Sequence, residues 1–324
     1  MEVRWGFIGC GDVTEKKSGP AFNKVKGSKV VSVMRRNGHL AKDYATRHGV
    51  STWYDSATDL INDTNVNAVY VATPPSTHAR YAIEAMQAGK PVYVEKPMAA
   101  SYAECQEMLK VSRQTGKPLF VAYYRRTLPG FLKVKELVKD GHIGKPLMVN
   151  IRLTRPALEA EANVNNQSWR VDPRIAGGGL FYDLASHQLD YLMFVFDDII
   201  EVNGLTDCMG GLYKAEDTVV ANFRFRSGLL GVGAWSFVTG EAAQEDVMEI
   251  IGTEGKILFS GFGHSPVRLM TSRGILEFPY HNPENIQYYL IEQVVEAING
   301  KRQCVSTGET AAQTNWVMEQ VVKY

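Results

Sequence analysis

The chain has 324 residues, which is enough for about two domains at roughly 150 residues per domain. Apolar residues make up 45% of it and charged residues 22%, so the composition excludes a disordered, collagen-like or coiled-coil chain. Lys plus Arg and Asp plus Glu both number 35, so no general field attracts nucleic acid or an acidic membrane surface. We therefore expect no nucleic-acid partner and no membrane partner.

The distribution of apolar residues and cysteines indicates a cellular location. The longest apolar run near the middle of the chain, 191–196, is far shorter than the roughly 18 residues of a membrane helix. The first residues include Glu2 and no long apolar stretch, so they do not predict a signal peptide. The cysteines are scattered and form no CxxC pair or Cys/His cluster, a pattern that favours a reducing cytoplasm. They are Cys10, Cys105, Cys208 and Cys304.

Short apolar runs alternate with helical patterns through residues 1–121. Continuous apolar strands of this kind suit a parallel sheet that is covered on both faces. Strand and helix in alternation predict a doubly wound, Rossmann-type α/β domain over this range. The expected strands are 3–8, 29–34, 66–72, 91–94 and 118–122.

Helix signals lie between these runs. A helix is expected to begin at 76–77 and to stop at Gly89. The next begins at a capping box made by Ser101 and Glu104 and stops at Gly116.

The pattern changes over residues 122–324. Alternating strands joined by tight turns predict an antiparallel sheet with one buried face, and two strong helices interrupt it. We expect an α+β second domain, with the last helix, about 307–323, packing back on the first domain. The expected strands are 147–153, 219–226, 229–237, 247–251 and 256–259, and the two helices are 179–196 and one from 282–283 to Gly300.

A glycine-rich turn, 9–14, follows the first strand directly. Gly9 permits the tight turn, and Gly11 lets the backbone approach a pyrophosphate at a helix N-terminus. The third position of the fingerprint is Thr14 rather than glycine, and Pro20 is expected to split the following helix. The pattern favours dinucleotide binding, and an ordinary strand-to-helix turn is the alternative. The expected cofactor contacts here are Gly9, Gly11, Asp12 and Val13.

The end of the second strand bears on the type of cofactor. NAD-binding domains usually place Asp or Glu there to bond the ribose hydroxyls. This chain has Arg35 and Arg36 instead, with no acid before Asp43. Two guanidinium groups suit a 2′-phosphate, so NADP(H) is the preferred cofactor and NAD(H) stays possible. The alternative is that both arginines are merely solvated.

Two more motifs follow sheet strands. Thr73 and Pro74 open a rigid loop after the strand at 66–72, and His78 is expected to line the cofactor there. Glu95 and Lys96 follow the strand at 91–94, and we expect both to contact the cofactor. A lysine at a strand end is poorly explained by packing, and burial can turn it into a general acid or base.

The last constellation begins with three glycines at 177–179. On the helix that follows, Asp183 and His187 are four residues apart and share a face with Asp190. A carboxylate one turn from a histidine can orient its ring and raise its basicity. The alternatives are a surface histidine with a helix-supporting acid, or a metal site, which no cysteine or second histidine supports. We expect no metal.

Taken together, these motifs resemble the Gfo/Idh/MocA oxidoreductases, the family of glucose–fructose oxidoreductase and inositol dehydrogenase. The resemblance spans essentially the whole chain, and Thr14 is its one departure in the glycine fingerprint. It is carried by Gly9-x-Gly11, Ala72-Thr73-Pro74 with His78, Glu95-Lys96-Pro97, Tyr124-Arg125-Arg126, the glycine run with Asp183 and His187, and Gly252-Thr253-Glu254-Gly255.

The resemblance implies a Rossmann domain, an open-faced and mostly antiparallel sheet domain, and a homodimer or dimer of dimers formed through that sheet. It implies a catalytic centre of Lys96, Asp183 and His187 and the transfer of a hydride between NAD(P) and a sugar, polyol or related hydroxy/keto substrate. We also expect Tyr124, Trp169 and Arg170 to contact the substrate, together with Asp183 and His187. The alternatives are a glycoside hydrolase that retains NAD and a cofactor-sensing regulator without turnover.

Overall fold

The computed structural model describes residues 1–163, 165 and 167–323, and these form two compact units. The first unit comprises Met1–Tyr124 and Pro283–Ala312, and the second comprises Arg125–Asn282 and Gln313–Tyr324. The boundary expected from the sequence, after residue 121, assigned Pro283–Ala312 to the second domain. This segment lies in the first unit because its helix buries Leu290 and Ile291 in the core of the first sheet.

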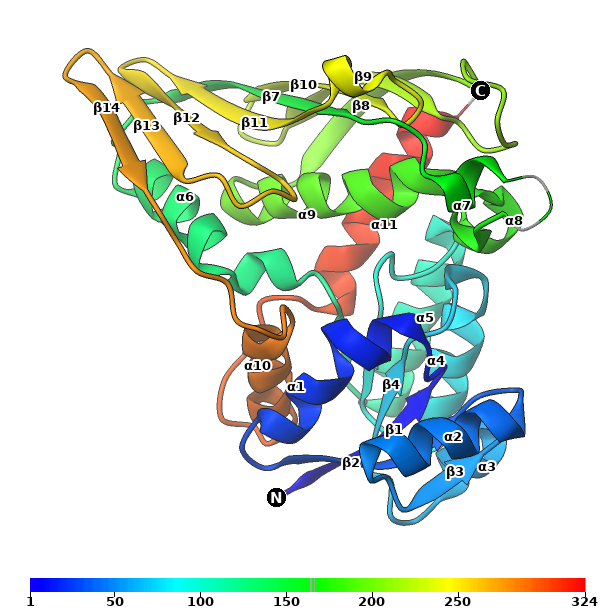
Figure 1. Ribbon diagram of the computed structural model, residues 1–324. Helices are drawn as coiled ribbons and strands as arrows, with labels where there is room; N and C mark the ends of the chain where they lie inside the picture. The colour runs from blue at the N-terminus through cyan, green and yellow to red at the C-terminus, as the bar shows by residue number, and fades with distance from the viewer. Residues whose placement is uncertain (164, 166, 324) are drawn as a thin grey trace. The chain divides into compact units, whose positions relative to one another are not determined.

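The first unit is built on a six-stranded parallel sheet in the order β3-β2-β1-β4-β5-β6 (Figure 1). This is the doubly wound order, and its switch point lies between β1 and β4, where ligands bind in open α/β sheets. The Rossmann fold expected from the sequence is confirmed. The strands are β1 (Val3–Ile8), β2 (Ser28–Met34), β3 (Thr52–Tyr54), β4 (Ala68–Val71), β5 (Val92–Val94) and β6 (Leu119–Val121).

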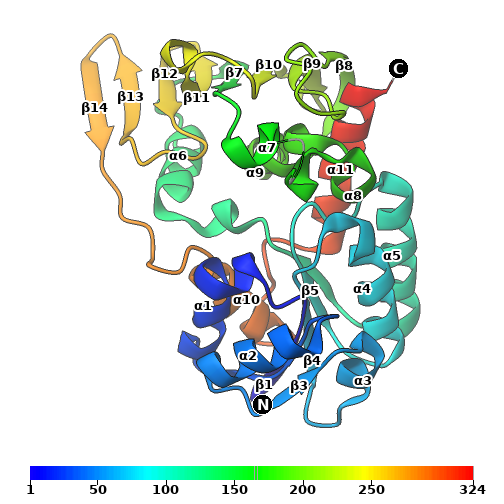
Figure 2. The same ribbon diagram turned by 45° about the vertical axis from the view of Figure 1, so that its right-hand side comes forward.

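Helices cover both faces of this sheet, as Figure 2 shows. On one face, Phe22 packs against Phe7 and Tyr70 with ring centroids 4.8 Å apart in both pairs. The helices of that face are α1 (Gly19–Lys24), α2 (Gly38–His48) and α10 (Tyr288–Ile298). The opposite face carries α3 (Ala57–Asn62), α4 (His78–Gln87) and α5 (Tyr102–Thr115).

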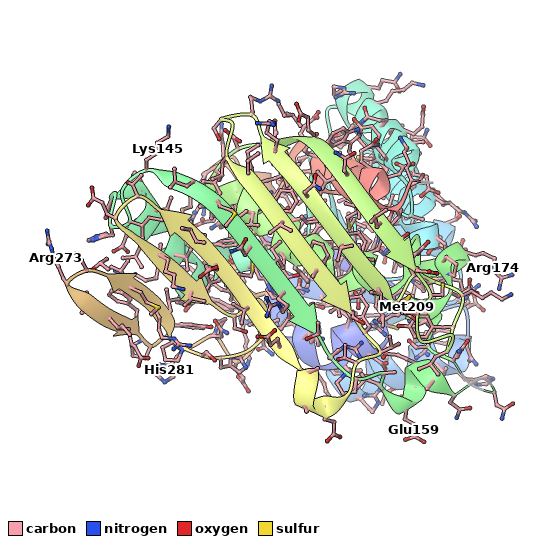
Figure 3. All side chains as sticks on the ribbon, turned by 90° about the horizontal axis from the view of Figure 1, so that it is seen from above. Lys145, Glu159, Arg174, Met209, Arg273 and His281 are labelled. Carbon is pink, nitrogen blue, oxygen red and sulfur yellow. The ribbon has the colours of Figure 1, made fainter. Side chains whose placement is uncertain are left out.

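The second unit contains an eight-stranded sheet in the order β14-β13-β12-β11-β7-β10-β9-β8, seen from its open side in Figure 3. All neighbours are antiparallel except β7 and β10, so the expected mostly antiparallel sheet is confirmed. The strands are β7 (Pro146–Thr154), β8 (Ile199–Asp207), β9 (Thr218–Phe225), β10 (Leu230–Ser236), β11 (Glu245–Gly252), β12 (Gly255–Phe259), β13 (Val267–Thr271) and β14 (Gly274–Phe278).

One face of this sheet is covered by α6 (Pro129–Lys139), α9 (Ser186–Val195) and the later turns of α11 (Gly308–Val322) (Figure 1). Phe131 and Tyr191 bring α6 and α9 onto Phe259 of β12, with ring centroids about 6 Å apart. Two short helices, α7 (Glu159–Ala162) and α8 (Pro173–Ala176), precede α9. The other face exposes apolar side chains, among them Val220 and Val232 at 45% each.

Two helices differ from the sequence expectation. The helix expected from 282–283 begins only at Tyr288, and the residues directly before it form no regular helix. The helix expected over 179–196 consists of a π-helical turn, η5 (Phe181–Ala185), followed by α9. Within the described ranges no helix combines the length and the apolar composition that a membrane span requires.

Candidate active site

The loop after β1 is shaped by two glycines with different tasks. Gly9 has a φ of +93°, and a Cβ there would lie 2.6 Å from Thr73 Cγ2. Its N–H donates to Met34 O at 2.9 Å, so the loop is tied to the end of β2 as well. A Cβ on Gly11 would meet nothing nearer than Gly9 O at 4.0 Å among the described residues. The backbone over Gly11 is therefore open, which is the room a pyrophosphate needs.

The third fingerprint position closes the loop in another way. Thr14 is fully buried, and its hydroxyl donates to Gly11 O at 2.8 Å. The close approach that a glycine usually provides is made by Gly19, where a Cβ would lie 1.9 Å from Thr14 O. Asp12 precedes the π-helical turn η1 (Val13–Lys17), and Pro20 stands at the start of α1, so the helix is split as expected.

Arg35 and Arg36 follow β2 directly, and both are exposed. Neither side chain has a hydrogen-bond or ion-pair partner within the part of the chain that the structure describes. Arg47 on α2 contrasts with them. Its guanidinium holds Glu15 at 2.7 Å and Asp43 at 2.8 Å, and its hydrogen bonds lower the pKa of Glu15 to about 2. The two arginines after β2 thus remain available to an anionic ligand.

His78 joins two loops at the carboxyl end of the sheet. Its Nε2 lies 2.7 Å from Thr73 O and its Nδ1 lies 3.0 Å from Pro97 O. Burial lowers the pKa of His78 to about 4, so the ring is neutral and donates to one of these carbonyls at a time. From the sequence we predicted that this side chain lines the cofactor. Its exposed fraction is 0%, so it holds the Thr73–Pro74 loop against the loop after β5 instead.

Lys96 is fixed through its neighbour Glu95, which is buried. Glu95 Oε1 accepts from Tyr70 Oη at 2.5 Å and from Gln287 Nε2 at 2.7 Å. Its second oxygen accepts from the Lys96 backbone N–H at 3.3 Å, and Tyr93 Oη donates to Gln287 Oε1 at 2.8 Å. Because protein donors surround the carboxylate, Glu95 acts by holding the end of β5. Gln287 was not predicted as part of this site, since it comes from the distant segment before α10.

Three residues predicted to bind substrate lie together in the second unit. Arg170 Nε lies 3.4 Å from Asp183 Oδ2, and its guanidinium carbon is 4.5 Å from the centre of the Trp169 ring. Gly178 leaves room for Tyr182, whose ring atoms would lie 2.2 Å from a Cβ at that glycine. The glycine run therefore lets the turn η5, which carries Asp183, pack tightly.

His187 lies in the first turn of α9, one turn after Asp183, and only 3% of it is exposed. Its ring packs edge-on against Phe262, with centroids 6.2 Å apart. The intervening π-helical geometry is frequent at functional sites. Tyr124 begins the short helix η3 (Tyr124–Thr127) at the end of the first unit.

Asp190 differs from the expected grouping with Asp183 and His187. Arg126 binds both of its carboxylate oxygens, at 2.7 and 2.8 Å, and both side chains are buried. Burial raises the pKa of Asp190, and the Arg126 charge opposes that rise. Asp190 therefore anchors α9 in the core. Among the described residues, no group of three His, Cys, Asp or Glu side chains is arranged to hold a metal ion.

The predicted residues thus form one group at the strand ends of the first unit and one around η5 and α9 in the second. A doubly wound sheet with an open glycine loop at its switch point defines a nucleotide-binding protein. Residues 3–123 match the oxidoreductase family with an NAD-binding Rossmann fold, and residues 131–258 match the GFO/IDH/MocA C-terminal domain. The chain belongs to the Gfo/Idh/MocA family of oxidoreductases, as the motifs implied.

Known proteins are similar to this chain over nearly its full length. The chain is 37% identical to an oxidoreductase of Formosa agariphila, over 98% of this chain and 97% of that protein. It is 30% identical to the 1,5-anhydro-D-fructose reductase of Ensifer adhaerens, over 94% and 91%. Levoglucosan dehydrogenase, solved with NADH and levoglucosan, has the same fold, with a TM-score of 0.89 at 22% identity over 99% and 96% of the two chains.

Proposed function

We propose that this oxidoreductase is an NAD(P)-dependent dehydrogenase or reductase of a sugar, a polyol or a related hydroxy/keto compound. The observation that carries the proposal is the support of Lys96 at the end of β5, where the buried Glu95 carboxylate binds its backbone N–H at 3.3 Å. A half-buried lysine whose backbone is held at the end of β5 is poorly explained by packing and is suited to acid–base chemistry. The similarity to a 1,5-anhydro-D-fructose reductase supports the substrate class.

The residues of the first unit fit a nicotinamide dinucleotide. The backbone of Gly9, Gly11, Asp12 and Val13 would hold the pyrophosphate, and Thr73 with Pro74 would border it. Arg35 and Arg36 would bind a 2′-phosphate, so we propose NADP(H) as the preferred cofactor with NAD(H) possible. When bound, the nicotinamide supplies hydride acceptor or donor chemistry, and the protein supplies position and electrostatics.

Proton transfer falls to this chain's own side chains. As a substrate alcohol is oxidised, its hydroxyl proton passes to a ring nitrogen of His187, and in reduction the proton returns. The Lys96 ammonium stabilises the alkoxide that develops on the same oxygen. Asp183 orients the substrate and His187, and its contact with Arg170 keeps its carboxylate in place.

Aromatic and cationic groups would contact the substrate. Trp169 offers a flat apolar surface for a sugar ring, and Arg170 offers donors for hydroxyl groups. Tyr124 is proposed as a further contact from the first unit.

The open face of the second sheet supports a proposal of self-association. Alternate residues on β9 and β10 expose Val220, Leu230 and Val232 at 45–48%, next to Met148 on β7. A second copy of this face would cover these side chains in a two-fold interface, giving a homodimer or a dimer of dimers. Sedimentation at micromolar concentration should show a dimer or tetramer, and Val232→Asp should shift it toward monomer. A monomeric parent protein contradicts the proposal.

The test of function follows the absorbance of the reduced nicotinamide over a panel of aldoses, ketoses, inositols and sugar phosphates. Each compound is assayed with NADP(H) and NAD(H) in both directions. Turnover that changes this absorbance with at least one carbohydrate is the expected result. Release of free sugar without net reduced cofactor, from protein that retains NAD, would instead indicate a glycoside hydrolase. Cofactor binding with no turnover of any compound would indicate a regulator.

A further inference from the structure

A half-buried carboxylate organises the segment that follows β12. Asp246, on β11, accepts hydrogen bonds from the backbone N–H groups of Gly261 at 2.9 Å, Phe262 at 2.7 Å and Gly263 at 2.9 Å. The Ser260 hydroxyl donates to the same carboxylate. A charged acceptor that satisfies three successive N–H groups fixes the backbone of the whole segment. Residues 260–263 are called the Asp246 loop below.

The Asp246 loop is packed against the start of α9. The Phe262 ring lies edge-on to the His187 ring, with centroids 6.2 Å apart and planes at 78°. The Arg125 guanidinium lies 4.4 Å from the centre of the Phe262 ring and donates through Nε to Gly261 O at 2.7 Å. The Phe262 ring therefore contacts both the Arg125 cation and the His187 imidazole.

The residue that follows His187 on α9, Gln188, also packs against the Asp246 loop. A Cβ on Gly261 would lie 3.0 Å from Gln188 Nε2, so this glycine allows the loop to approach the helix. Trp235 Nε1 on β10 donates to Gln188 Oε1 at 2.8 Å, and Gln188 is fully buried. The loop and β10 together restrict movement of the turn that carries His187.

We propose that Asp246 is a positioning residue for the reaction: by shaping residues 260–263 it seats Phe262 against the His187 ring and fixes that ring for proton transfer. The proposal rests on the proposed role of His187. A proton acceptor displaced by even 1 Å loses much of its effect, so a group that fixes the ring acts on turnover without touching substrate.

The first test is Phe262→Leu, which keeps an apolar side chain and removes the ring edge. We expect kcat to fall about tenfold, while substrate KM and the Kd of NADPH stay within about twofold. The second readout needs neither substrate nor cofactor. In protein labelled with ¹³C-histidine, the Cε1 resonance of His187, identified by its loss in His187→Ala, should shift and broaden.

The second test compares two loop-shaping carboxylates. Asp217 is fully buried and accepts from the N–H groups of Met209 at 2.9 Å and Gly210 at 2.8 Å, and from the Thr218 hydroxyl at 2.9 Å. Both Asp246→Asn and Asp217→Asn should lower the Tm, because each leaves backbone donors poorly satisfied. Only Asp246→Asn should also lower kcat and move the His187 resonance. An equal loss of kcat in both variants would mean general destabilisation and would overturn the inference.

The two proposals can fail separately. If His187→Ala keeps its turnover, the acid–base role fails, and the resonance still reports whether the loop seats the ring. If His187→Ala loses turnover but Phe262→Leu and Asp246→Asn change neither kcat nor the resonance, the positioning inference alone is wrong. Combining Phe262→Leu with His187→Ala should cost no further turnover, because the ring acts only through the imidazole.

Discussion

The candidate site residues of the two units of this oxidoreductase are held by different kinds of contact. In the first unit the backbone shapes the loop proposed to hold the cofactor: Gly9 and Gly11 leave it open, and His78 joins two backbone carbonyls beside it. In the second unit side chains from distant segments meet, as Arg126 does with Asp190 and Phe262 with His187. A loop shaped by its own glycines can be predicted from neighbouring residues in the sequence. A contact between two distant side chains forms only in the completed fold, so a local pattern does not predict it.

The largest expected effect tests whether both units supply chemistry. Lys96→Ala and His187→Ala should each lower kcat by about 10²- to 10⁴-fold, because each would remove a group that we propose to act on the substrate oxygen. Asp183→Asn should cost less if it only orients His187, and more if it also holds a substrate hydroxyl. Stopped-flow and steady-state rates should be measured beside cofactor Kd, which we expect to be nearly unchanged.

The control for that series is Lys110→Ala, an exposed lysine on α5 that pairs with Glu107 at 3.3 Å. It should turn over like the parent protein. A Lys96→Ala enzyme with full kcat would assign the chemistry to the second unit alone and would break the comparison.

The next largest effect concerns stability in the second unit. Arg126→Met leaves the Asp190 carboxylate buried without its cation, and removing one partner of such a pair costs about 3–5 kcal/mol of unfolding free energy. Adding Asp190→Leu should recover much of that loss, because the pair is then replaced by apolar groups. The exposed pair of Arg226 with Asp198, at 2.9 Å, offers the contrast, since Arg226→Ala should barely change the urea midpoint. An Arg126→Met midpoint equal to the parent's would contradict the assignment of Asp190 as an anchor.

Sequence patterns were sufficient for most of the first unit. The strand expected at 3–8 is β1, and Gly116 ends α5 with a φ of +65°. Ser101 caps α5 by accepting from the Glu104 N–H at 3.2 Å. These signals are local, because strand alternation, caps and turns depend on neighbouring residues. Strand β3 was missed because it has only three residues, none of them fully buried.

The same sequence patterns predicted fewer of the contacts and strands of the second unit. Sequence periodicity places Asp183, His187 and Asp190 on one helix, but it gives no sign that Arg126 binds Asp190 across 64 residues. Strand β14 was also missed, because nearly all of it is exposed and no buried face imposes an alternation. Such pairings are decided by tertiary contacts, which no local window contains.

A pH prediction tests the backbone-held part of the first unit. The pKa of His78 lies at about 4 against an ordinary 6.5, because burial disfavours the imidazolium. Between these values the unfolded chain binds the proton and the folded chain does not, so stability is full above pH 6.5 and falls as the pH drops toward 4. The shift corresponds to about 3 kcal/mol at most.

Urea unfolding from pH 7 to pH 4 checks this. The His78→Gln protein should be less stable at pH 7 and should show a shallower loss over that window. The exposed His142→Gln variant should keep the parent's slope. A His78→Gln protein with the same slope as the parent over this window would contradict the burial of a neutral His78.

The smallest expected effect concerns two exposed side chains of the first unit, Arg35 and Arg36. Arg35 and Arg36 have no partner among the described residues, so a 2′-phosphate can take both without breaking an existing bond. A hydrogen bond to a charged group is worth about 1.5–3 kcal/mol, which is about ten- to a hundredfold in affinity. NADP(H) should therefore bind more tightly than NAD(H) by that factor, and replacing both arginines with alanine should remove most of the difference. Fluorescence titration with both reduced cofactors measures this difference in affinity.

Arg47→Ala is the matched control, because its guanidinium is already held by Glu15 and Asp43 and its loss should leave the affinity ratio unchanged. Equal affinity of the parent protein for the two cofactors would mean that the arginines are only solvated.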